Sequence, residues 1–168
     1  MEQSGLQKTW VRILLTFLTA AMMTLIFLFS TEPAERSDQT SGHFSMTVIS
    51  VIHPDYETYT PEKKESLYAS VQHVVRKCAH FTEYTILGVL LRLCLESWIG
   101  RKKKLIPGSW GIGTLYACTD ELHQLITDGR SGQWTDVLLD SGGVLTGVLA
   151  ASLILLAIRR KGKRTQCP

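Results

Sequence analysis

The stretch VRILLTFLTAAMMTLIFLF, residues 11–29, decides the class of this protein. It is apolar apart from Arg12 at its edge and a few threonines. About 20 such residues in a helix cross the hydrocarbon core of a membrane. A cleaved signal peptide is the alternative, since Lys8 and Arg12 would suit its basic start. However, the apolar run exceeds the usual length of about 7–15 residues, and no A-x-A cleavage site follows it, so we expect an uncleaved helix.

Three further apolar segments follow, at about residues 76–98, 105–126 and 134–158. The first two of these have polar ends, which weakens their hydropathy signal. The mean hydropathy of the whole chain is only +0.07, so the distribution of apolar residues decides the class, not their total. We predict an all-α membrane protein, a single domain over residues 1–168, with four transmembrane helices.

Basic residues predict the orientation of these four spans. They precede the first span (Lys8, Arg12), fill residues 101–104 (RKKK) and follow the last span in residues 159–164 (RRKGKR). In a four-span protein these regions share one side, and the positive-inside rule makes that side cytoplasmic. Both termini are therefore predicted inside and residues 128–133 outside. The net charge of +3 then reflects topology and attraction to lipid head groups, not a surface for nucleic acid.

The segment between the first two spans, residues 31–75, is predicted to lie outside. Residues 31–60 are rich in Ser, Thr, Pro and charge and indicate a loop. Within it, residues 44–52 (FSMTVISVI) fit either a strand or a short helix, and periodicity does not decide between them. From Thr60 onward an N-cap residue, Pro61 and Glu62 favour a helix start. We expect an amphipathic helix on or near the outer surface, leading into the second span.

The four cysteines do not indicate a disulfide framework. Cys78, Cys94 and Cys118 lie in predicted spans, Cys167 lies in the C-terminal tail, and no C-x-x-C pair occurs. We interpret them as small packing residues.

Ionisable residues lie inside three of the apolar segments, always near the predicted outer end. Such residues are costly in a bilayer, face the protein interior and mark functional sites. From the helix rise, Glu83, Asp120 and Asp140 each lie about 9–10 Å below the outer end of their segment. A shallower layer and a basic rim lie above them: His80, His123, Gln124 and Asp136, then Arg76, Lys77 and Arg130. Glu121 is expected to pair with Gln124, three residues later.

Asp136 and Asp140 are four residues apart, and the same stripe continues through Gly143 and Gly147. Two small residues four apart let helices approach closely, so the polar face of the last span is also predicted to be its packing face. Away from this cluster, Arg92 is expected to pair with Glu96 one helical turn later.

Four interpretations of the polar layer stay open. It could bind the head group of an amphiphile, or perform acid–base catalysis with carboxylates in a site of low dielectric. It could bind a divalent metal through His80, Glu83, Asp120 and His123, although H-x-x-E alone is a weak signal, and we expect neither metal nor cofactor. It could also be a structural hydrogen-bond network that locks the helices together.

VRKCAHFTEYTILGVLL (75–91) and TDELHQLITDGRSGQWTDVLLDSGGVLTG (119–147) closely resemble the VanZ-like family of small bacterial membrane proteins. The motifs H-x-x-E-Y, D-E-x-H-Q, G-R and D-x-x-x-D-x-x-G fall in the family's order. The resemblance implies site residues at His80, Glu83, Tyr84, Asp120, Glu121, His123, Gln124, Arg130, Asp136 and Asp140.

The family's namesake is associated with resistance to teicoplanin-type glycopeptides, which act on lipid-linked wall precursors outside the membrane. The resemblance implies a multi-pass protein of the bacterial cell membrane with an outward-facing polar pocket. We expect its partner to be a membrane lipid, a lipid-linked envelope precursor or a lipoglycopeptide, not nucleic acid. An intramembrane enzyme acting on a lipid-linked head group and a structural membrane subunit are the alternatives.

Overall fold

The computed structural model describes residues 8–31, 34–100, 102, 104–126 and 133–164, without the side chains of residues 34–40 and 162–164. Throughout these ranges the ordered elements are helical, and no strand occurs in them. They are α1 (Thr9–Ser30), α2 (Ala34–Ile52), the short 3-10 helix η2 (Tyr56–Thr58), α3 (Pro61–Ile99), α4 (Leu105–Gln124) and α5 (Trp134–Arg164). The predicted all-α class is therefore confirmed.

Three of these helices are long and apolar enough to cross a membrane: α1, α3, and α5 as far as Lys161. The chain is thus a membrane protein. The 20-residue helix α4, which covers most of the predicted third span, does not reach the same apolar threshold. The C-terminal end of α4 carries the polar residues Asp120, Glu121 and Gln124, which make the helix less apolar. All three side chains are buried against neighbouring parts of the protein.

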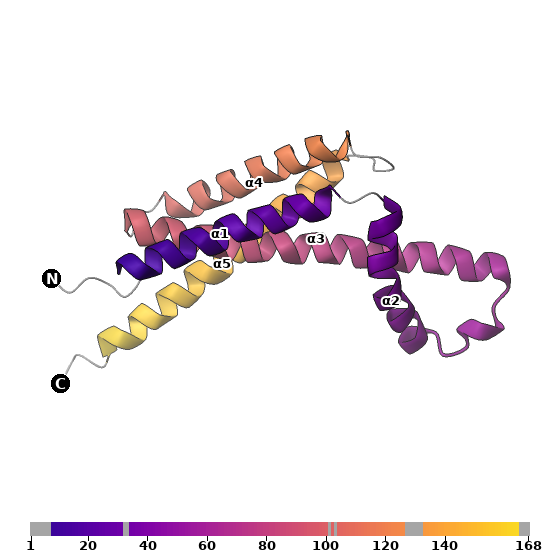
Figure 1. Ribbon diagram of the computed structural model, residues 1–168. Coiled ribbons are helices and arrows are strands. Elements are labelled where there is room, and N and C mark those ends of the chain that lie inside the picture. Colours follow the sequence, from indigo (N-terminus) through magenta and orange to yellow (C-terminus); the bar gives the residue numbers. More distant parts are fainter. Residues whose placement is uncertain (1–7, 32–33, 101, 103, 127–132, 165–168) are drawn as a thin grey trace.

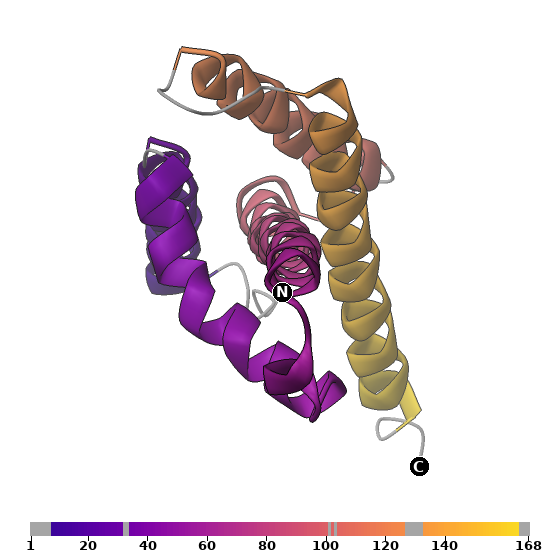
Figure 2. The same cartoon turned by 90° about the vertical axis from the view of Figure 1, so that its right-hand side faces the viewer.

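The helices run back and forth between two ends of the molecule (Figure 1). The start of α1, the end of α3, the start of α4 and the end of α5 lie at one end, which we call the basic end. The described basic side chains there are Lys8, Arg12, Lys102, Lys104, Arg159, Arg160 and Lys161. The end of α4 and the start of α5 lie at the other end, which we call the acidic end. Viewed nearly along α3, α4 and α5 lie on one side of it and α1 and α2 on the other (Figure 2).

Helix α3 is one continuous element of 39 residues. At a rise of 1.5 Å per residue it is about 58 Å long, almost twice the roughly 30 Å hydrocarbon core of a bilayer. Thr60 is its N-cap residue, Pro61 opens it and Glu62 lies in its first turn, as predicted. The expected amphipathic helix is therefore not a separate element beside the second span. It is the straight N-terminal extension of that span, and it projects beyond the bundle (Figure 1).

Helix α2 replaces the loop that was predicted for residues 31–60. Its C-terminal half contains the ambiguous run 44–52, which is helical rather than a strand. Ser45 and Ile49, four residues apart, are fully buried, and α2 packs against α3. A Cβ added at Gly42 would lie 2.8 Å from the Tyr68 hydroxyl, so the two helices approach closely there. Packing against the projecting half of α3 stabilises α2 as a helix, although the polar composition of this segment predicted a loop.

Backbone contact between α3 and α5 forms the centre of the bundle. A Cβ at Gly88 would collide with the Val144 carbonyl, and one at Gly147 with the Thr85 carbonyl. A Cβ at Gly143 would lie 2.7 Å from the Phe81 carbonyl oxygen. The predicted packing role of Gly143 and Gly147 is therefore confirmed. The buried apolar cluster lies around this crossing and contains Ile26, Tyr84, Leu87, Leu91, Ala117, Val144 and Val148.

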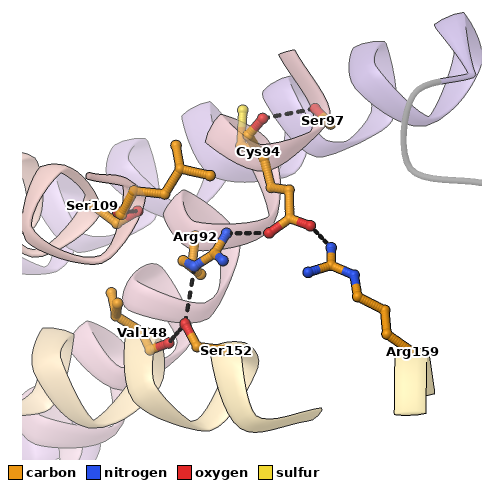
Figure 3. Close-up of polar contacts among 9 residues, drawn as sticks. Arg92, Cys94, Ser97, Ser109, Val148, Ser152 and Arg159 are labelled. Atoms are coloured by element: carbon orange, nitrogen blue, oxygen red, sulfur yellow. Dashed lines mark hydrogen bonds and ion pairs between the residues drawn. The ribbon is translucent and has the colours of Figure 1, made fainter. Parts of the chain in front are cut away.

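Toward the basic end, a buried ion network joins the same two helices (Figure 3). The Arg92 guanidinium lies 2.6 Å from Glu96 Oε2, which confirms the predicted pair one turn apart. Arg159 of α5 pairs with the other oxygen, Glu96 Oε1. Arg92 Nε also donates to Ser152 Oγ at 2.9 Å. A residue expected only as a topology signal, Arg159, therefore holds α5 against α3.

The cysteines make no disulfide within the described part of the chain. Cys78, Cys94 and Cys118 have free thiols; Cys78 is exposed and the other two are half-buried. Cys167 lies outside the described residues.

Candidate functional site

Three buried polar side chains from three different helices meet at the acidic end. Tyr84 of α3 is fully buried, Asp120 of α4 is 3% exposed and Asp140 of α5 is 1% exposed. The Tyr84 hydroxyl interacts electrostatically with both carboxylates and lies toward Asp120. The close approach of α5 to α3 at Gly143, one turn after Asp140, brings its carboxylate to this depth.

The most informative property of these three side chains is how little they bond to each other. Both carboxylate oxygens of Asp140 are buried and have no hydrogen-bond partner in the described part of the chain. The buried Asp120 Oδ1 and Tyr84 hydroxyl make no hydrogen bond of good geometry there, although the hydroxyl is directed at the Asp120 carboxylate. Asp120 Oδ2 accepts a long bond of 3.3 Å from Gln124 Nε2. Leaving a buried polar atom unsatisfied costs about 1–3 kcal/mol, so such atoms are rare and call for an explanation.

A second layer of polar side chains surrounds this centre, and here the groups are paired. The buried Glu121 accepts the backbone N–H of Gln133 at 2.6 Å through Oε1. The ammonium of Lys77, on α3, pairs with the Asp136 carboxylate, on α5. Both side chains of that pair are about a quarter exposed, so this layer is closer to solvent than Asp140.

The cluster as a whole is strongly acidic. Asp140 lies within electrostatic range of three carboxylates, Asp120, Glu121 and Asp136, and of one ammonium, Lys77. We call the four carboxylates the acidic cluster. Like charges in a site of low dielectric repel each other, so an ionised acidic cluster needs a cation or protons to offset its charge.

The remaining residues of the predicted site lie around this cluster or outside the description. His80 and Glu83 are half-buried on α3. His123 is half-buried and its ring centroid lies 4.7 Å from that of Phe27 on α1. Arg130 lies outside the described residues.

The structure changes one detail of the predicted convergence. The rise per residue of a helix predicted one depth for Glu83, Asp120 and Asp140. Depth does not determine the direction in which each side chain points around its helix. Adjacent residues differ by about 100° around a helix, and it is Tyr84 that is fully buried beside Asp120 and Asp140. The resemblance had included Tyr84 among the site residues, but depth arithmetic did not single it out.

Sequence reasoning also left Lys77 at the rim, whereas the structure pairs it with a site carboxylate. A signal was present: Lys77 lies seven residues, or about two turns, before Tyr84, so the two share a face of α3.

A metal site requires several ligands that converge on one point. Among the described residues, no group of three or more His, Cys, Asp or Glu side chains does so. Carboxylates and a phenol without internal partners can instead bind hydrogen-bond donors of a ligand or exchange protons with it.

Comparison with known proteins supports the resemblance seen in the sequence. The profile of the VanZ/LLP1 family matches residues 15–156, a range that contains Tyr84 and all four carboxylates of the acidic cluster. No curated protein matches the chain. No solved structure matches it.

Proposed function

This chain belongs to the VanZ/LLP1 family, and on that premise we propose that its acidic cluster binds the polar head group of a cell-envelope amphiphile. The amphiphile is a membrane lipid, a lipid-linked wall precursor or a lipoglycopeptide. In the last case, binding would contribute to resistance against teicoplanin-type antibiotics. The head group would enter a polar pocket lined by the acidic cluster and Tyr84, with His80, Glu83, His123, Gln124 and Arg130 around it.

The proposal includes a topology. Helix α4 would cross the membrane with α1, α3 and α5, alongside which it runs and against which it packs (Figure 1). The basic end faces the cytoplasm of a bacterial cell, in keeping with the positive-inside rule. The acidic end then faces outward, where envelope precursors and glycopeptides are found. The N-terminal half of α3 and α2 project on that outer side.

One observation carries the binding proposal: the most deeply buried polar atoms of the cluster have no partner within the described residues. A structural lock works by satisfying its own donors and acceptors. Here Asp140, the most buried carboxylate, accepts no hydrogen bond within the described residues, although Lys77 is within electrostatic range and Gln124 bonds the neighbouring Asp120. Hydrogen-bond acceptors without partners, where three helices meet, favour a ligand-binding role over a structural hydrogen-bond network.

Acid–base catalysis on a lipid-linked head group is the second candidate. The same unpartnered carboxylates support it, because a general acid or base must be free to exchange its proton with a bound substrate. Turnover of the bound amphiphile would distinguish catalysis from binding.

The test is an untargeted lipid analysis of the full chain, purified gently into nanodiscs, beside a matched Asp140→Asn variant. We expect one class of amphiphile to be enriched with the native chain and lost from the variant. Equal lipid content in both preparations would contradict the proposal. Appearance of a chemically altered head group, dependent on Asp140, would select the enzyme.

Teicoplanin susceptibility of cells expressing either form tests the resistance part separately. Resistance that requires Asp140, at equal protein levels, supports a lipoglycopeptide as the ligand. Equal susceptibility of the two strains would remove resistance from the proposal and leave lipid binding to be judged by the nanodisc experiment.

A further inference from the structure

The unpartnered atoms of the acidic cluster restrict the chemistry of its ligand. Three of them are carboxylate oxygens, two on Asp140 and one on Asp120, and the fourth is the Tyr84 hydroxyl. Ionised carboxylates only accept hydrogen bonds. A phosphate or sulfate head group presents acceptors and negative charge as well, so at these four atoms it would meet repulsion and a single donor, the phenol.

The outer layer of the same cluster shows which group these carboxylates accept. There the primary ammonium of Lys77 pairs with Asp136. Asp140 follows Asp136 by one helical turn on α5 and is more deeply buried. Lys77 is within electrostatic range of Asp140, but no described cation forms a direct ion pair with it. Asp140 is thus a carboxylate like Asp136, but it lacks the paired ammonium that Asp136 has in Lys77.

We propose that the acidic cluster accepts a protonated primary amine, so that the amphiphile it binds carries an ammonium in its head group. This inference rests on the proposed function and specifies its ligand class. An ammonium offers three donors and one positive charge. The two oxygens of Asp140 and Oδ1 of Asp120 provide three acceptors, and the Tyr84 oxygen lies beside them.

Other cations fit this arrangement less well. A divalent metal needs ligands that converge, and the described side chains offer no such group. A quaternary ammonium has no N–H to donate and is bound by cages of aromatic faces. The described aromatic pair nearest to it, Tyr84 and Tyr116, is tilted by 44° with centroids 6.3 Å apart, and the Tyr116 hydroxyl is committed to the Met23 carbonyl.

The experiment compares head groups on one alkyl chain. The full chain in dodecyl maltoside micelles at neutral pH is titrated with n-dodecylammonium, n-dodecyltrimethylammonium or 1-dodecanol, and binding is counted by native mass spectrometry. We expect dodecylammonium to bind at least about tenfold more tightly than either analogue, which corresponds to about 1.4 kcal/mol. Equal affinity for dodecylammonium and dodecyltrimethylammonium would overturn the proposal without reference to any variant.

Variants then locate the binding. Asp140→Asn keeps the shape of the side chain but removes its charge, and should weaken dodecylammonium binding at least about tenfold. Tyr84→Phe removes a single hydroxyl and should weaken it severalfold. The control is Glu65→Gln, an exposed carboxylate on the projecting half of α3, which should leave binding unchanged. An unchanged affinity in both site variants, or an equal loss in the control, would refute the assignment.

Failure of this inference can be told apart from failure of the proposed function. If the nanodisc experiment finds an amphiphile with an anionic or uncharged head group whose retention requires Asp140, the binding function stands and the ammonium is wrong. If no amphiphile depends on Asp140, both fall. Melting curves of each variant in the same micelles show whether a loss of binding reflects unfolding.

Discussion

The substitution Glu96→Gln should destabilise the protein more than any other single change in its ion network. Glu96 is 3% exposed and holds two guanidiniums at once, one on each carboxylate oxygen. The amide keeps the volume of the side chain but carries no charge, so Arg92, 6% exposed, loses its counter-ion while it stays buried. Arg159 at the same time faces Arg92 without an intervening anion (Figure 3).

The expected loss follows from the burial of the pair. Removing one partner of a buried ion pair costs about 3–5 kcal/mol, because the other charge stays desolvated. For a chain of this length, 1 kcal/mol shifts the melting temperature by roughly 2–4 °C, so we expect a decrease of about 6–20 °C. Thermal unfolding in nanodiscs, followed by helical circular dichroism, measures it.

Two comparisons test the reasoning behind that magnitude. Arg159→Gln should cost clearly less, since the Arg159 side chain is 34% exposed and water solvates what remains. Replacing the buried pair together, Arg92→Met with Glu96→Leu, should recover much of the stability, because apolar side chains of similar volume often substitute for a buried ion pair at little cost. The argument would be refuted if the Glu96→Gln variant melted within 2 °C of the native chain. It would also be refuted if Arg159→Gln melted at a lower temperature than Glu96→Gln.

Three further expectations concern the helix crossing, the outer ion pair and the topology. Gly147→Ala should cost about 1–3 kcal/mol, since its Cβ collides with the α3 backbone, whereas Gly111→Ala on α4 meets nothing within 4 Å and should be neutral or stabilising in the same melting assay. Lys77→Met should cost at most about 1 kcal/mol, because its partner Asp136 is 26% exposed, and a loss as large as that of Glu96→Gln would contradict this. A single cysteine at Lys102, in a cysteine-free background, should react with an impermeant maleimide only after cells are opened; labelling of intact cells would reverse the proposed orientation.

Patterns that depend on a single helix were predictable from the sequence. The apolar run of α1 and the Asp–Gly stripe of α5 required only counting and a period of 3.6 residues. The pair of Arg92 with Glu96 required only their spacing of four. The approach of Asp120 and Asp140 followed from comparing depths on two helices, since both lie close to the outer end of their segments.

Features that depend on the rotation of one helix against another were not predictable in this way. Rise fixes the depth of Glu83 and Tyr84 almost equally, and only the contact of α3 with Gly143 shows which of them is buried beside the carboxylates. For the same reason α2 was missed. Among the side chains of α2 that the structure describes, Ser45 and Ile49 are the buried ones, and tertiary packing on α3 outweighs the loop-like composition of the sequence.

The marginal apolarity of α4 has a consequence for how the protein is made. Helix α4 leaves the ribosome before α5, yet α5 is one of the helices against which it packs. Until α5 arrives, the carboxylates at the end of α4 lack the neighbour that helps to remove them from lipid, and exposed carboxylates oppose partition into the bilayer. On the proposed topology, α4 would therefore stay partly in water while the next helix is translated. Helices α4 and α5 would then enter the membrane together, because α4 becomes stable in lipid only once α5 packs against it.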